Sequence, residues 1–167
     1  MAIVEARPRV FTYHTTSEWM GRRNGRFAVA GKESFVFSSP PEFKGEDGFL
    51  SPEELFVGSV EMCLMLTFAA LAEKQKLPIE AYSSEATGTL EHANGELRFT
   101  HILVKPTIII STTDAAPRVL QTLQLAHRSC MIANSIQAEV KVEGTVTPVR
   151  GDVTHERPST PPFSSGS

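Results

Sequence analysis

Cys63 and Cys130 are the two cysteines of the chain, and their side chains are the ones best suited to covalent chemistry. Two thiols in a reducing compartment are more often free or reactive than joined in a structural disulfide. A chain of 167 residues with 41% hydrophobic content can be stable through burial alone. We therefore expect any bond between these sulfurs to be a step of a reaction. The alternative is that both cysteines are unrelated, small apolar core residues.

The reaction that two such thiols suit is the reduction of a peroxide. A thiol attacks as the thiolate, and burial in the middle of a helix opposes ionisation, so the attacking sulfur needs a fixed cation nearby. Arg22, Arg23 and Arg26 cluster in one predicted turn that could reach over a helix of its own subunit or of a partner. The alternative is that all three are solvated.

Glu53 lies ten residues before Cys63, which is about 15 Å along a helix, so it cannot touch that sulfur. At this distance it could hold an arginine by a two-point hydrogen bond without opposing ionisation of the thiol. Cys130 could condense with the sulfenic acid that a peroxide leaves on Cys63. The two α-carbons would then have to lie within about 7 Å, although the residues are 67 positions apart.

The elements that must position these residues follow an α+β order. Ser51 and Pro52 begin a helix that continues to about Lys76, and its apolar residues occupy nearly every face, which predicts burial all round. A second helix runs from Thr113 to near Cys130. The expected strands are residues 9–15 and 26–37 around a turn at 21–26, then 79–91 and 96–111 around Asn94-Gly95, and finally 138–147. We expect the helices to pack against the sheet.

The rest of the composition sets limits. We expect one domain over residues 1–149 and a disordered tail, rich in Pro, Ser, Thr and Gly, over 150–167. The formal net charge of −3 gives no basic field for nucleic acid. Charges such as Glu61 and Glu73 interrupt the apolar stretches, so no membrane span is expected. The amino terminus does not have the pattern of a secretory signal, so the expected compartment is the cytoplasm. The histidines show no metal-binding spacing and no cofactor is expected; they are His14, His92, His101, His127 and His155.

Two segments resemble the OsmC/Ohr family of organic hydroperoxide reductases. The first is SPEELFVGSVEMC at residues 51–63, followed by LMLTFAALAEKQKLP, and the second is LAHRSCMIANSIQAEVKVEG at residues 125–144. The GRRNGR turn is similar to that of the Ohr branch. The resemblance extends over about residues 9–147, nearly all of the expected domain.

This resemblance implies a role for each candidate residue. Cys63 would be the peroxidatic cysteine and Cys130 the resolving cysteine, while Glu53 would hold the active-site arginine, which Arg23 matches best and Arg22 or Arg26 could replace. It further implies antiparallel sheets around a long central helix in an intertwined homodimer. Such a cysteine-based enzyme reduces alkyl or lipid hydroperoxides and is re-reduced by a dithiol, in the Ohr branch a lipoylated protein.

The sequence departs from the family pattern at two places. Residues 131–133 are Met, Ile and Ala where many members have Pro after the resolving cysteine, and Glu61 stands where small apolar residues are common. Helical spacing turns Glu61 about 200° away from Cys63, which favours a polar interface or a salt bridge for it. These departures motivate a second hypothesis, a dimeric OsmC-like module that binds an apolar ligand with little or no peroxidase turnover. A third hypothesis is that the protein has this fold but no ligand-binding pocket and serves a structural role.

Overall fold

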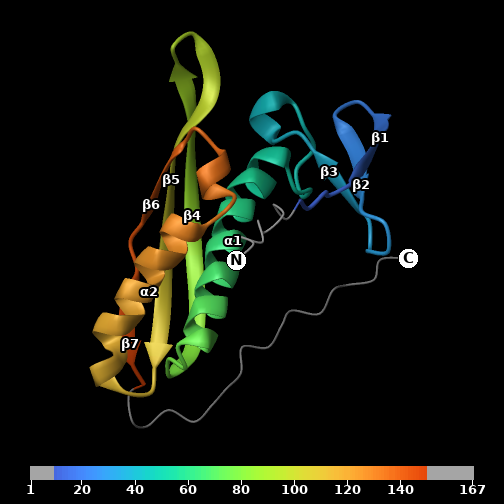
Figure 1. Ribbon diagram of the computed structural model, residues 1–167. Helices are drawn as coiled ribbons and strands as arrows, with labels where there is room; N and C mark the ends of the chain where they lie inside the picture. Colours follow the sequence, from blue (N-terminus) through green and yellow to red (C-terminus); the bar gives the residue numbers. More distant parts are fainter. Residues whose placement is uncertain (1–9, 150–167) are drawn as a thin grey trace, which may run out of the picture. The chain divides into compact units, whose positions relative to one another are not determined.

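The computed structural model describes residues 10–149, which Figure 1 draws in colour. The chain divides into two compact units with the boundary between residues 62 and 63, and each unit is described by itself. The disordered tail expected at residues 150–167 lies outside the described residues. The single domain expected over residues 1–149 stays a prediction.

The first unit contains a three-stranded antiparallel sheet in the order β1-β2-β3. The hairpin expected around residues 21–26 is confirmed, because Arg22 and Arg23 connect the first two strands. The elements are β1 (Thr16–Gly21), β2 (Asn24–Ala28), β3 (Phe35–Ser38) and a short 3-10 helix, η1 (Pro41–Phe43).

The predicted bounds of two strands in this unit are wrong. The first strand begins at Thr16 and does not cover residues 9–15, and residues 26–37 form two strands instead of one. The chain reverses between β2 and β3, where Gly31 has a φ of 76° and the Lys32 N–H donates to the Val29 carbonyl at 3.0 Å. Glycine adopts this left-handed conformation without steric cost, so the turn forms inside an otherwise strand-like run of residues.

The helix that carries Cys63 has a reciprocal cap at its amino end. The Glu54 N–H donates to Ser51 Oγ at 3.1 Å, and the Ser51 N–H donates to Glu54 Oε2 at 2.7 Å. This capping box satisfies two backbone groups that a helix start would otherwise leave unpaired. The helix, α1, spans Pro52–Lys74, so the expected start is confirmed and the expected end near Lys76 differs by two residues.

The second unit is built on a long hairpin. β4 and β5 pair antiparallel along their whole length, and Asn94 and Gly95 form the turn with φ angles of 55° and 85°, so the expected hairpin is confirmed. The second helix is confirmed too, with a 3-10 turn at its start. The elements are β4 (Ile79–Ala93), β5 (Glu96–Ile110), η2 (Thr113–Ala115), α2 (Ala116–Ser129), η3 (Ala133–Ser135), β6 (Glu139–Val142) and β7 (Thr145–Pro148).

The last expected strand is interrupted, and its pairing differs from the expectation of purely antiparallel sheets. Residues 138–147 form parts of β6 and β7, and both strands pair parallel to β5, as Figure 1 shows. The break falls at Gly144, where an added Cβ would lie 2.2 Å from Leu123 Cδ2 of α2. Helix α2 thus provides the crossover connection that a parallel pair requires. The α+β class is confirmed, with a mixed sheet in this unit.

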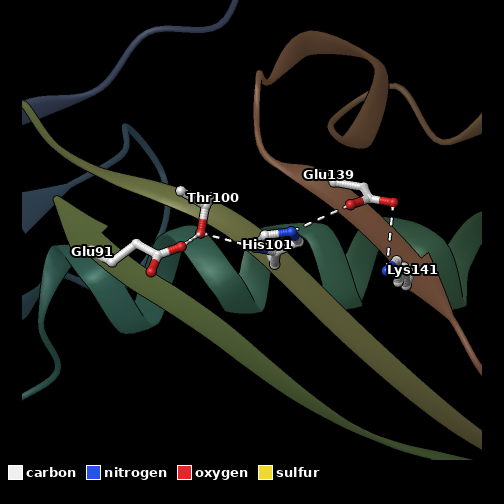
Figure 2. A network of polar contacts seen from close by, with 5 residues as sticks. All are labelled: Glu91, Thr100, His101, Glu139 and Lys141. Carbon is white, nitrogen blue, oxygen red and sulfur yellow. Dashed lines mark hydrogen bonds and ion pairs between the residues drawn. The ribbon is translucent and has the colours of Figure 1, made fainter. Parts of the chain in front are cut away.

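A polar ladder on the exposed side of the sheet links its strands (Figure 2). Thr100 Oγ1 donates to Glu91 Oε1 at 2.5 Å and lies 2.9 Å from His101 Nδ1. Glu139 then joins His101 at 3.4 Å and Lys141 at 3.6 Å, and His101 and Glu139 are direct partners in the parallel register. Because these side chains are about half exposed, the ladder adds little stability beyond the backbone pairing.

The core of the second unit lies along one side of β5. Alternate residues Ile102, Val104, Ile108 and Ile110 are buried, and so are apolar residues of both helices. Phe68 of α1 stacks on Tyr82 of β4 with ring centroids 5.5 Å apart. The core residues from the helices are Leu64, Phe68, Ala72, Val119, Leu123 and Ala126.

Two hydrogen bonds join the helices near the end of α1. Thr122 Oγ1 donates to Gln75 Oε1 at 3.1 Å, and Arg118 Nη2 donates to the Gln75 carbonyl at 3.4 Å. These bonds hold α2 beside α1, so the fold fixes where α2 ends relative to Cys63.

The expectation that α1 is buried on every face is wrong for the single chain. Met62 is 53% exposed and Leu66 is 64% exposed. By length and composition alone α1 is also apolar enough to cross a membrane, despite the charge of Glu61. The core helix of a soluble protein can meet the same criteria, and α1 contributes buried residues to the core of the second unit.

We predict that Ser51→Ala lowers the free energy of unfolding by about 1 kcal/mol, because it removes the side-chain acceptor of the α1 cap. Ser51→Asp is the matched control, since aspartate also caps helices. Urea denaturation of both variants and the wild type measures the effect. Equal losses in the two variants would contradict the assigned role of the cap.

Candidate functional site

The structure brings the two cysteines together within the second unit. Cys63 lies in the middle of α1, and Cys130 directly follows Ser129, the last residue of α2. The two side chains hydrogen-bond to each other, and both are free thiols. Cys130 is fully buried and Cys63 is partly exposed. The expected juxtaposition of two sulfurs remote in sequence is therefore present.

The surroundings of Cys63 favour its thiolate. Burial by itself raises the pKa of Cys63, but hydrogen bonds to the sulfur outweigh it and leave the pKa below the ordinary value of a thiol. The donors are the backbone N–H of Ile132, the Cys130 thiol, the Thr67 hydroxyl and the backbone N–H of Met131. Cys63 is consequently the more acidic sulfur of the pair.

The surroundings of Cys130 favour its protonated form. Burial raises its pKa most, and the neighbouring Cys63 raises it further through the shared hydrogen bond and through charge repulsion. Backbone N–H groups of Ala133 and Ile132 act in the opposite direction without cancelling the rise. When the pair loses a proton, the charge thus falls mainly on Cys63, and Cys130 keeps its proton and donates to it.

Sequence reasoning missed the donors that surround these sulfurs. Thr67 follows Cys63 by four residues, and this helical spacing on one face could have indicated it. The backbone N–H groups of residues 131–133 have no comparable signature, because every residue type except proline supplies one. The lack of proline in residues 131–133 is the one visible sign, since it leaves all three N–H groups available.

Glu53 lies in the first turn of α1, where the sequence placed it. Its Oε2 atom is buried and has no hydrogen-bond partner among the described residues. An unpaired buried carboxylate oxygen is costly, so this position can accept a guanidinium. Its location in the helix that carries Cys63 agrees with the expected spacing.

The arginines lie in and beside the β1–β2 turn. Arg22, Arg23 and Arg26 are all exposed, and Arg22 adopts a left-handed φ of 48° that forms the turn. No ion pair joins Arg23 to Glu53 in residues 10–149. The two cysteines lie together as expected, and the assignment of an arginine to the site stays a prediction.

The described part of the chain contains no group of three or more His, Cys, Asp or Glu side chains that could hold a metal ion. The chemistry available at the site is that of a polarised thiol pair. One sulfur is poised to attack an electrophile, and the second is close enough to attack the first once it has been oxidised.

Comparison with known proteins gives a family and a shared fold. The family described as OsmC-like protein matches residues 45–144. Protein YmaD of Bacillus subtilis, described as uncharacterized, is 24% identical over 135 residues, covering 78% of this chain and 90% of its own length.

Two solved structures are similar over most of the chain. An OsmC-like protein of unknown function from Vibrio cholerae has a TM-score of 0.75 at 25% identity, covering 81% of this chain and 100% of its own. An organic hydroperoxide resistance protein from Elizabethkingia anophelis has a TM-score of 0.66 at 21% identity, covering 84% and 98%. At this identity the second likeness shows the fold alone.

We predict that Thr67→Val raises the pKa of Cys63, because it removes one donor to the thiolate. The thiolate fraction at neutral pH then falls, and alkylation of Cys63 slows by about threefold at pH 7. The pH profile of iodoacetamide labelling, read by peptide mass, measures the shift. Thr67→Ser retains the hydroxyl and should keep the wild-type profile, whereas an unchanged profile in Thr67→Val would refute the prediction.

Proposed function

Because the chain belongs to the OsmC-like protein family, we propose that it is a thiol-dependent peroxidase that reduces organic hydroperoxides. The observation that supports this most strongly is the hydrogen-bonded pair of thiols, in which Cys63 has a lowered pKa and Cys130 a raised one. A peroxidatic thiol must be ionised to attack, and a resolving thiol must lie within bonding reach of the sulfur that is oxidised.

The proposed reaction has two steps on the protein. The Cys63 thiolate attacks the terminal oxygen of the hydroperoxide, which breaks the O–O bond, oxidises the sulfur to a sulfenic acid and releases an alkoxide that takes a proton to give the alcohol. Cys130 then attacks the Cys63 sulfur, and the hydroxyl leaves as water with the Cys130 proton. A dithiol, such as that of a lipoylated protein, reduces the resulting disulfide.

Arg23 and Glu53 complete the proposed site. The unpaired buried oxygen of Glu53 supports this role, since a guanidinium held there would keep its charge and present further N–H donors. Such donors would stabilise the negative charge that develops on the leaving oxygen. Arg22 and Arg26 are the alternatives to Arg23.

We propose a homodimer and an apolar substrate on related grounds. The exposed apolar side of α1, which includes Met62 and Leu66, is the kind of surface that an obligate partner covers. The exposed Met62 side chain, which directly precedes Cys63, suits the alkyl or lipid part of a hydroperoxide. The proposed compartment is the cytoplasm, where reducing conditions would keep both thiols free.

One observation favours the second candidate, a module that binds an apolar ligand without turnover. A cavity of about 280 Å³ lies between α1 and the start of β4, lined mainly by apolar side chains. Met65 and Ala69 in its lining project about 200° and 240° around the helix from Cys63, so a ligand there would face away from the sulfur. The lining residues are Met65, Phe68, Ala69, Ala72, Glu73, Leu77, Ile79 and Tyr82.

We predict that the chain consumes cumene hydroperoxide with dithiothreitol or dihydrolipoamide as reductant, and that Cys63→Ser lowers the rate to that of buffer. Cys130→Ser is the matched control, because it should still consume about one equivalent in a single turnover. Equal consumption by the wild type and Cys63→Ser would exclude Cys63 as the nucleophile. No consumption by either would favour the binding module.

We also predict that Leu66→Glu converts the dimer to a monomer, because it places a charge in the covered apolar surface. Sedimentation velocity measures the change. Lys74→Glu, an exposed change in the last turn of the same helix, is the control and should leave the assembly intact. A wild-type protein that sediments as a monomer would refute the proposed homodimer.

A further inference from the structure

A fully buried serine in the first unit carries an inference that rests on the proposed function, in which Arg23 belongs to the active site. We propose that Ser38 is a positioning residue that fixes the backbone of Arg23 relative to the first turn of α1, where Glu53 lies. Ser38 is the last residue of β3, and 0% of it is exposed. A buried hydroxyl costs free energy unless it is hydrogen-bonded, so its partners indicate its role.

Two hydrogen bonds from the end of β3 converge on the Arg23 carbonyl, and we call this pair of donors the serine clamp. The Ser39 N–H donates at 3.2 Å, and Ser38 Oγ donates at 3.5 Å. Ser38 Oγ also accepts from the Glu46 N–H at 3.0 Å, which leaves its single proton for the Arg23 carbonyl. Arg23 lies in the two-residue turn between β1 and β2, so the clamp holds it where the pairing of these strands ends.

Ser38 is tied to the start of α1 as well. Its N–H donates to the Leu50 carbonyl at 3.1 Å, and Leu50 directly precedes Ser51, whose side chain caps the helix. Glu53 follows in the first turn. A continuous path of covalent and hydrogen bonds thus joins the Arg23 carbonyl to the helix turn that carries Glu53, and all of this path lies within the first unit.

The loop between β3 and α1 packs closely on the serine clamp. A Cβ added to Gly45 would overlap the carbonyl of Ser39 and would lie 3.0 Å from Ser38 Oγ. A residue larger than glycine would therefore push the clamp or the loop aside. Glycine at residue 45 is what lets the loop come near enough for the Glu46 N–H to reach Ser38 Oγ.

The serine clamp distinguishes Arg23 from the two other arginines of this region. The Arg22 carbonyl accepts instead from Trp19 Nε1 at 3.2 Å, and Arg26 lies inside β2, paired with both neighbouring strands. A cation stabilises a developing charge best when it is in place beforehand. Arg23 is the arginine whose carbonyl the clamp connects to the turn of Glu53, so the proposal selects it for the site.

The test is a double-mutant cycle on the initial rate with cumene hydroperoxide. We expect Ser38→Ala to lower kcat/KM by about threefold to tenfold, the effect of losing one buried hydrogen bond. Ser34→Ala, which removes a hydroxyl at the opposite end of β3, is the matched control and should keep the wild-type value.

The cycle separates positioning from general damage to the fold. The loss caused by Ser38→Ala should disappear in an Arg23→Ala background and persist in Arg22→Ala and Arg26→Ala backgrounds, because residues that act through one another are not additive. An equal loss in all three backgrounds would overturn the proposal, since it would assign Ser38 a merely structural role.

A second readout needs no peroxidase activity. The ratio of the rates at which iodoacetate and iodoacetamide alkylate Cys63 reports positive charge beside the sulfur, because only the first reagent is an anion. We expect Arg23→Ala to lower this ratio about fivefold, and Ser38→Ala to lower it about twofold to threefold when Arg23 is present and not at all when it is absent. A ratio that either single change leaves at the wild-type value would overturn the proposal.

The two readouts also tell this inference apart from the proposed function. A chain that fails to reduce hydroperoxides while the ratio responds as expected would refute the peroxidase and leave the role of Ser38 standing. Gly45→Ala keeps the test decisive if circular dichroism shows that Ser38→Ala does not fold, because it disturbs the same clamp through Ser39. It should lower the ratio in the same Arg23-dependent way, and an unchanged ratio would overturn the proposal.

Discussion

The hydrogen bond between the Cys63 and Cys130 thiols is the interaction on which the rest of the account depends. Burial opposes ionisation of both sulfurs, so neither would react readily alone. Placing them together makes their protonation states interdependent, because charge on one sulfur raises the pKa of the other. The donors around Cys63 decide which sulfur loses its proton first, and that loss leaves a thiolate beside a protonated thiol.

The fold of the second unit brings this pair together. α1 carries Cys63, and α2 is fixed beside it by the hydrogen bonds to Gln75 and by packing of Leu123 against Gly144. β6 and β7 run parallel to β5, so the chain needs a crossover connection after β5 before it can form β6. Helix α2 is that connection. Cys130 directly follows α2, so the topology that completes the sheet also places the second sulfur.

Much of this was predictable from sequence, for physical reasons that differ between elements. Ser51-Pro52 and Asn94-Gly95 have strong local preferences, so α1 and the long hairpin were correctly located. The sequence predicted one strand at residues 26–37 and one at 138–147, where the structure has two in each place. Strand-like residues lie on both sides of Gly31, which forms a turn, and of Gly144, which packs against α2, so neither break has a clear signal in the sequence. The parallel pairing depends on where α2 lies, which is a tertiary property without a local signal.

The site was predictable to a similar extent. Cys63 and Cys130 were identified and lie together, while the pairing of Glu53 with an arginine stays a prediction because residues 10–149 contain no such ion pair. The donors in residues 131–133 were missed, since backbone N–H groups do not depend on residue identity. The exposed side of α1 was predicted to be buried, because its apolar composition does not reveal which of its faces the rest of the chain covers.

The most direct test of the central claim is the covalent state of both cysteines after one equivalent of cumene hydroperoxide, read by mass spectrometry of peptides from the non-reduced protein. We predict one product, a disulfide between Cys63 and Cys130, with no sulfinic acid on Cys63. Two unchanged thiols, or an over-oxidised Cys63 beside a free Cys130, would contradict the account.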